Sequence, residues 1–217
     1  METVQWLAWI GWGIVLCISF PIGAVEQFRN NKSYQHRIFA TMLILFLLWR
    51  LRAGISDDLT FHFLGMTALT LIYGWRMACV IGTIPAFGMV VLGLVPWSNA
   101  GLYLLTTVTL PALISYSVFL LSYYCLTRHL FVYIFVAAFL NGAVAIAANL
   151  LITACGVWFV GSHSWHYISD NYLQLLPLVL FPEALLNGMT ITLLVVYRPQ
   201  WVCTFADRDY FDPTHKF

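Results

Sequence analysis

The sequence has few charged residues. Asp, Glu, Lys and Arg make up 9% of its 217 residues, whereas a soluble domain carries roughly a quarter. With 61% hydrophobic residues and a mean hydropathy of +0.84, the chain cannot cover itself with a hydrated surface. Its 10 basic and 9 acidic residues nearly cancel, so no cationic surface is available for a nucleic-acid backbone, and we expect no nucleic-acid partner.

Several motifs of soluble proteins and enzymes are also absent. The five cysteines form no short-spaced pair, and the first four lie in apolar runs, which excludes a disulfide framework and a zinc knuckle. No Walker A motif is present, so any ATP-driven step needs a separate ATPase. No Ser-His-Asp or Cys-His set can be placed on one membrane face. We therefore expect no enzyme activity and no permanently bound cofactor.

Long apolar runs are abundant, and the bilayer is the solvent that suits them. We count seven runs, at residues 4–22, 34–49, 59–73, 77–95, 101–126, 130–160 and 172–197. The sequence therefore predicts an all-α, polytopic integral membrane bundle of about seven transmembrane helices. The first run follows an acidic residue and no basic one, so we expect a retained helix and not a signal peptide.

The basic residues predict the orientation of this bundle, because Lys and Arg concentrate in cytoplasmic loops. An external amino terminus places eight of the 10 basic residues inside and leaves only Arg50 and Arg52 outside. The loops 96–100 and 161–171 contain no Lys or Arg and would be external. We predict a single transmembrane domain over residues 1–217, whose carboxyl-terminal part, about 198–217, is a short cytoplasmic tail.

His62 is the first polar candidate for function. If residues 58–66 are helical, Asp58, His62 and Met66 share one face. A neutral imidazole binds transition metals, a carboxylate can orient it, and a thioether favours a soft ion such as Cu(I). Such a site would lose affinity as the pH falls through about 6.5. The alternative is an interfacial histidine paired with Asp58, with Met66 only packing.

Other polar residues carry weaker signals. His163 and His166 in the loop 161–171 could capture a metal at the mouth of a path, although two loop histidines are a weak pattern. Glu183 is the only acidic residue well inside a run. A buried carboxylate there is protonated, paired or bound to a cation. We consider structural pairing, ligand coordination, or water access through a helix unwound at Pro177 and Pro182.

The order of these polar residues resembles the CbiM/NikM family, the membrane substrate-capture and permease components of energy-coupling-factor transporters for cobalt and nickel. The resemblance extends from about Ser56 to Arg198. Its segments are Phe61-His62-Phe63-Leu64-Gly65 with Leu71-Ile72-Tyr73-Gly74-Trp75, then Ser98-Asn99-Ala100, Pro182-Glu183-Ala184-Leu185-Leu186-Asn187-Gly188, and Val196-Tyr197-Arg198-Pro199-Gln200-Trp201. The last segment is similar to a proteobacterial, divergent branch of that family.

This resemblance implies that His62 matches the family's metal-binding histidine, and it marks Asn99, Glu183 and Asn187 as intramembrane polar residues of interest. It implies a transition metal ion as substrate, separate ATPase and coupling subunits as partners, and a multi-pass location in the bacterial inner membrane. The chain departs from the family at its start, where Met1-Glu2-Thr3 stands in place of Met-His. Half of the family's planar nitrogen site is thereby missing. Either the ion differs, or other groups such as Met66, Asp58 or His163 and His166 substitute, or metal binding has been lost. The alternative function is a non-transporting scaffold or sensor that keeps the fold.

Overall fold

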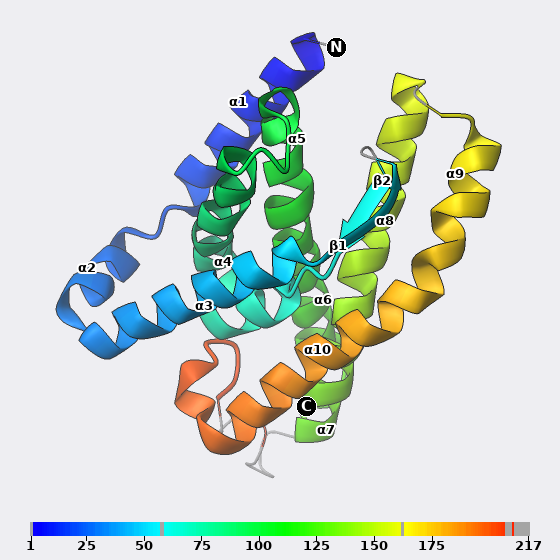
Figure 1. Cartoon of the computed structure of the whole chain (residues 1–217). Helices are drawn as coiled ribbons and strands as arrows, with labels where there is room; N and C mark the ends of the chain where they lie inside the picture. The colour runs from blue at the N-terminus through cyan, green and yellow to red at the C-terminus, as the bar shows by residue number, and fades with distance from the viewer. Residues whose placement is uncertain (1, 57–58, 162, 207–209, 211–217) are drawn as a thin grey trace.

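The computed structural model describes residues 2–56, 59–161, 163–206 and 210. The described elements are largely helical and include a single short hairpin (Figure 1). In chain order they are α1 Glu2–Ser19, α2 Ile22–Asn30, α3 Lys32–Arg50, β1 Arg52–Ser56, β2 Leu59–His62, α4 Met66–Val91, η1 Trp97–Asn99, α5 Ala100–Leu104, η2 Leu105–Thr109, α6 Leu110–Cys125, α7 Leu130–Val132, η3 Tyr133–Leu140, α8 Asn141–Val160, α9 Trp165–Asn171, η4 Leu173–Leu175, α10 Leu176–Tyr197 and η5 Pro199–Trp201.

The polar and apolar sides of the helices are arranged as a membrane requires. Polar side chains face the interior of the bundle, and apolar side chains face its outer surface. Along α10 the buried positions include Val179, Glu183 and Asn187, four residues apart, so they form one stripe that faces the bundle. The opposite side carries Leu178 and Phe181, which are each 68% exposed. A soluble helix would present charge on that side, so α10 is built to face lipid.

Four helical segments in the described part of the chain are long and apolar enough to cross a membrane: Met66–Val91, Trp97–Cys125, Leu130–Phe159 and Trp165–Tyr197. A fifth is added if Gln5–Ser19 and Gly23–Asn30, which meet at 70°, count as one broken span. A helical membrane bundle is therefore supported, and the predicted count of seven spans is not confirmed. The predicted orientation of the termini remains a prediction.

The difference in span count has two physical causes. The predicted second run is α3, in which Lys32, Arg37 and Arg50 lower the mean hydropathy, so it is not among the four segments apolar enough to cross a membrane. The predicted third run is divided between the strand β2 and the first turns of α4, so it is not a helix of its own. Hydropathy alone does not distinguish a buried hairpin strand from part of a helix.

Gly74 divides α4 into two helical parts. Its backbone has φ 79° and ψ 156°, a combination that is open to glycine and strained for other residues. The two parts turn toward each other, since a methyl group added at Gly82 would lie 3.2 Å from the Sδ atom of Met66. The break lies next to residue 73, where the third apolar run was predicted to end.

The segment that follows α10 forms hydrogen bonds with the backbone at this break. A non-helical residue at Gly74 deprives the carbonyls of Leu71 and Ile72 of their usual helical donors. The backbone N–H of Cys203 donates to Ile72 O (2.9 Å) and that of Thr204 donates to Leu71 O (3.2 Å). The Thr204 hydroxyl donates to Leu71 O as well (2.9 Å). The start of the predicted cytoplasmic tail is therefore an integral part of the bundle.

Shortening the chain tests this docking. A chain that ends after Val202 should melt at a clearly lower temperature than one that ends after Ala206, because two carbonyls lose their donors at about 1 to 3 kcal/mol each. Thermal unfolding in detergent measures the difference, and the chain ending after Ala206 controls for the loss of the last residues. Equal melting temperatures would show that the contact contributes no stability.

Candidate metal-capture site

His62 ends the strand β2 and lies outside the four segments that are long and apolar enough to cross a membrane. The strands β1 and β2 are antiparallel, and their register pairs Arg52 with His62 and Gly54 with Thr60. A side chain on Gly54 would collide with Thr60, which explains the glycine. The predicted helical face of Asp58, His62 and Met66 is therefore wrong, because His62 is in a strand and a left-handed Gly65 (φ 62°) separates it from α4. Asp58 lies outside the described residues.

Two aromatic rings enclose the imidazole of His62. Its centre lies 5.8 Å from the Trp49 ring of α3 and 6.2 Å from the Tyr103 ring of α5. The Trp49 indole is fully buried, and its Nε1 donates to the carbonyl of Leu64 (3.0 Å). This bond fixes the ring against the turn that follows His62. The imidazole is thus held in a slot, with 9% of its surface exposed.

One nitrogen of this imidazole remains available. Nδ1 lies 3.1 Å from the carbonyl of Phe63, so in the neutral ring Nδ1–H donates to that oxygen. Nε2 then keeps its lone pair, and it has no hydrogen-bond partner among the described residues. A backbone carbonyl that fixes the tautomer of a ligating histidine is a common arrangement in metal sites. The slot therefore presents one oriented nitrogen ligand.

The pKa of His62 is lowered to about 4, mainly by burial and to a smaller extent by the Arg52 guanidinium, and these effects outweigh the opposing effect of the Phe63 carbonyl. The imidazole is consequently neutral throughout the physiological range. The value of about 6.5 predicted for proton competition is too high for this environment. A metal ion at Nε2 would compete with protons only near and below about pH 4 to 5.

This pKa predicts how stability depends on pH. Between pH 6.5 and about 4 the unfolded chain binds a proton on His62 and the folded chain does not. Stability must therefore fall as the pH drops through this window, by on the order of 3 kcal/mol at its lower end. His62→Asn should flatten the decline of the melting temperature between pH 7 and 5, whereas replacing the exposed His36 should not. If the melting temperature falls equally with pH in the unmodified protein, His62→Asn and the His36 variant, the imidazole of His62 is not buried and neutral.

Arg52 is the charged neighbour of this slot. It donates from Nη2 to the Tyr103 hydroxyl (2.8 Å), from Nε to Trp49 O (3.1 Å) and from Nη1 to Leu94 O (3.3 Å). Its guanidinium carbon lies 5.3 Å from the centre of the Tyr103 ring, which also borders His62. Arg52 therefore fastens the two aromatic walls together and places a positive charge beside the imidazole.

Glu183 and Asn187 hold the turn behind His62 from the opposite side. The Glu183 carboxylate accepts the backbone N–H of Leu64 at Oε2 (2.9 Å) and that of Gly65 at Oε1 (2.8 Å). The Asn187 side chain donates to Glu183 Oε1 (2.8 Å) and accepts the N–H of Ala68 (2.8 Å). These contacts satisfy N–H groups at the start of α4, where a negative charge is also favoured by the helix dipole.

The structure distinguishes among the three alternatives for Glu183. Its partners are backbone amides and Asn187, so structural pairing is what the described residues show. The helix α10 continues through Pro182, so it is not unwound there. Gly142 allows α8 to pack closely against Asn187, since a methyl group at that position would lie 3.1 Å from Asn187 Nδ2.

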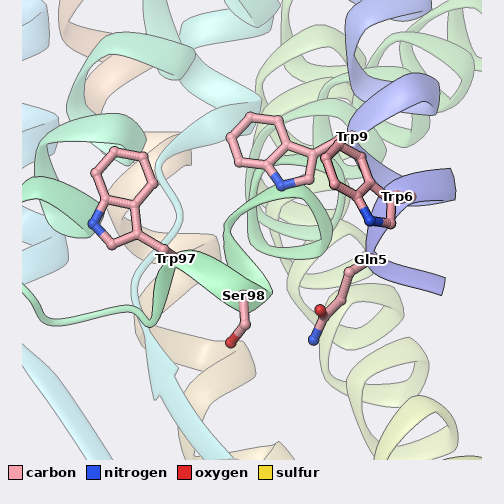
Figure 2. Close-up of a pocket in the computed structure, with 5 residues that line it drawn as sticks. All are labelled: Gln5, Trp6, Trp9, Trp97 and Ser98. Atoms are coloured by element: carbon pink, nitrogen blue, oxygen red, sulfur yellow. The ribbon is translucent and has the colours of Figure 1, made fainter. Parts of the chain in front are cut away.

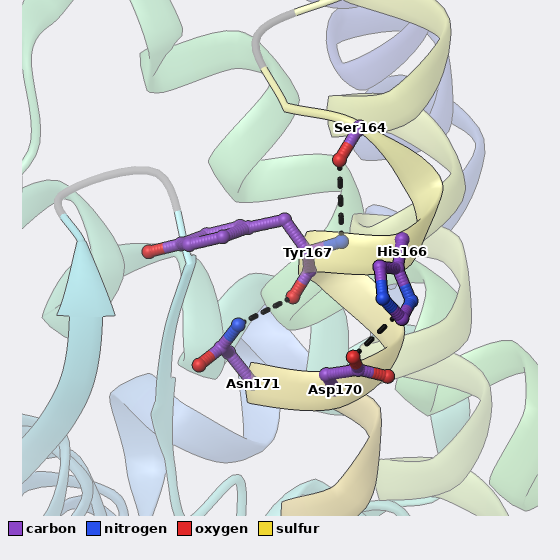
Figure 3. Close-up of polar contacts among 5 residues, drawn as sticks. All are labelled: Ser164, His166, Tyr167, Asp170 and Asn171. Carbon is purple, nitrogen blue, oxygen red and sulfur yellow. Dashed lines mark hydrogen bonds and ion pairs between the residues drawn. The ribbon is translucent and has the colours of Figure 1, made fainter.

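The other predicted ligands lie elsewhere. Met66 is fully buried at the start of α4, with its sulfur beside Gly82. Figure 3 shows His166 paired with Asp170 along α9 at 3.1 Å; the His166 side chain is 89% exposed. His163 stacks on the Tyr167 ring with centres 4.8 Å apart. The predicted external loop 161–171 contains the helix α9.

Asn99 lies beside a surface hollow that is separate from the His62 slot. Gln5 of α1 donates to Asn99 Oδ1 at a long 3.4 Å. Next to it, an open hollow of about 700 Å³ is lined by Gln5, Trp6, Trp9, Trp97 and Ser98 (Figure 2). Its lining has no ionisable side chain, so it offers no ligand for a metal ion.

The described residues contain no group of three or more His, Cys, Asp and Glu side chains that could hold a metal ion. Sequence reasoning found His62 and Glu183 but missed Trp49, Arg52 and Tyr103. The sequence did single out Arg52 in one respect: with Arg50 it is one of the two basic residues that the predicted orientation places outside. Nothing in the spacing of the two aromatic residues linked them to His62, since they come from α3 and α5.

Comparison with known proteins gives one positive finding. The family model CbiM, described as the cobalt uptake substrate-specific transmembrane region, matches residues 2–201. No curated protein and no solved structure matches the chain. The match covers nearly the whole chain and includes the hairpin, the Glu183 contacts and the segment after α10 as far as Trp201. The chain therefore belongs to the CbiM family, a family of transmembrane components for cobalt uptake.

Proposed function

We propose that this protein is the substrate-capture and permease component of an energy-coupling-factor transporter, and that it takes up a transition metal ion of the cobalt or nickel kind. The observation that carries the proposal is the oriented Nε2 of His62, presented in an aromatic slot outside the spans. The ion is substrate, and the protein retains no cofactor. Separate ATPase and coupling subunits supply energy, and the complex resides in a bacterial inner membrane.

In this mechanism His62 gives one nitrogen, and water and backbone atoms complete the coordination. Such a site binds its ion weakly and releases it easily, which suits capture followed by transport. The clamp formed by Glu183 and Asn187 connects the turn after His62 to the middle of α10. Movement of α10 on contact with a coupling subunit would then shift His62 and release the ion.

A second candidate function is a scaffold or sensor that keeps the fold without transporting metal. Arg52 is the observation that favours it, because a guanidinium beside the imidazole repels a divalent cation. At a separation of about 6 Å this repulsion amounts to roughly 1 to 5 kcal/mol, depending on the effective dielectric constant.

Equilibrium binding of Co(II) to the detergent-purified protein separates the two functions. A transporter should bind the ion, and Arg52→Gln should raise the affinity by about tenfold or more by removing the repulsion. Arg52→Lys keeps the charge and controls for the lost hydrogen bonds. If neither the native protein nor Arg52→Gln binds Co(II), Ni(II) or Cu(I), the scaffold or sensor function is the correct one.

A further inference from the structure

Trp201, the last residue of η5, has a guanidinium group from each of two arginines near its ring. The guanidinium carbon of Arg37, from α3, lies 4.8 Å from the centre of its ring, and that of Arg198 lies 5.9 Å away. Arg37 also covers the Tyr34 ring at 5.3 Å. The docking of Cys203 and Thr204 on α4 fixes the segment that carries Trp201. The fold therefore holds both guanidinium groups within 5.9 Å of the centre of the same ring.

Neither charge is compensated within the described residues. The one ion pair found there joins His166 and Asp170 in α9, remote in sequence from this cluster. The Nε of Arg37 is buried and has no hydrogen-bond partner in the described part of the chain. An unpaired donor on a charged, partly buried group is costly. Since Arg37 is only half-buried and Arg198 is exposed, an anion can reach both from outside.

The surroundings indicate the chemistry of this anion. The end of α10 exposes Leu193, Val196 and Tyr197, by 55%, 62% and 73%, so exposed apolar residues immediately precede Arg198. Guanidinium groups bind phosphate oxygens in a bidentate manner. Tryptophan is enriched at the level of lipid headgroups, and basic clusters beside spanning helices bind anionic lipids.

We propose that Arg37, Trp201 and Arg198 form a binding site for the phosphate headgroup of an anionic phospholipid, whose acyl chains lie along the exposed end of α10. The apolar surface favours a lipid over free phosphate or an acidic peptide, because neither of those would cover it. A bound lipid would join α3 and the carboxyl-terminal segment at one point of the membrane surface.

Phosphatidylglycerol and phosphatidylcholine of equal chain length, added to the full-length protein in a non-ionic detergent, test the proposal. Native mass spectrometry should show retained phosphatidylglycerol, and the melting temperature should rise by several degrees with this lipid and not with phosphatidylcholine. Arg198→Gln should reduce lipid retention several-fold, and Arg37→Gln should reduce it at least as much. Arg128→Gln is the matched control, since Arg128 is exposed and stacks on Tyr123 at 4.4 Å.

Arg198 is exposed, so its replacement leaves the fold intact and keeps the test valid if Arg37→Gln fails to fold. Equal retention of the two lipids, or an equal loss in Arg128→Gln and Arg198→Gln, would overturn the proposal. Stabilisation by inorganic phosphate alone, to the level seen with the lipid, would assign the site to a free anion and would overturn it as well. Phosphate without effect supports the lipid.

Discussion

His62→Ala should lower the affinity of the purified protein for Co(II) or Ni(II) by about 100-fold or more, because it removes the one oriented nitrogen ligand of the slot. His62→Asn should have the same effect while leaving the slot nearly filled, so that loss of binding is not confused with collapse of the aromatic walls. Titration calorimetry at pH 7 and pH 5.5 measures both variants. The unmodified protein should bind similarly at the two pH values, since the pKa of His62 is about 4.

Three further variants show whether the site is where the geometry indicates. His163→Ala and His166→Ala should bind as the unmodified protein does, because these side chains lie on and beside α9 and have partners of their own. Met66→Leu should leave the preference between Cu(I) and Co(II) unchanged, since the sulfur lies beside Gly82 in the interior. Equal binding by His62→Ala and the unmodified protein would remove His62 from the mechanism.

Glu183→Gln should destabilise the protein by roughly 2 to 4 kcal/mol, because it replaces a carboxylate oxygen with a donor. Glu183 accepts hydrogen bonds from Leu64, Gly65 and Asn187, so an amide group at this position must turn at least one N–H toward another N–H. The melting temperature in detergent should drop by several degrees. Affinity for Co(II) should also fall, since the turn after His62 loses its support.

Glu26→Gln is a matched control, because Glu26 is an exposed carboxylate on α2. Asn187→Asp is a second useful variant, because it places two carboxylates within hydrogen-bonding distance and should destabilise the same turn by charge repulsion. A Glu183→Gln protein that melts and binds metal as the unmodified protein does would show that this carboxylate is incidental to both.

The sequence predicted the helical membrane class correctly because long apolar runs with so little charge are typical of transmembrane helices and rare in soluble domains. It also identified Glu183 and His62, since an ionisable group near the membrane stands out against an apolar background. It could not predict the hairpin β1–β2, because the residues of β2 begin the apolar third run and those of β1 lie in the short stretch between the second and third runs. The partners of Glu183 were equally hidden, since backbone amides 118 and 119 positions away leave no mark in composition or spacing.

The hydrogen bonds between Thr204 and Leu71 have a consequence for biosynthesis, because 133 positions separate the two residues. At about 5 to 20 residues per second, the ribosome needs on the order of ten seconds to make the chain between them. During that time the Leu71 and Ile72 carbonyls at the Gly74 break lack these donors, and the hydrocarbon region of a bilayer offers no substitute. We therefore expect the break in α4 to stay near the membrane surface or beside the insertion machinery until the last residues emerge. In chains released early, the two carbonyls at this break would stay without donors, and quality-control proteases can recognise such a form.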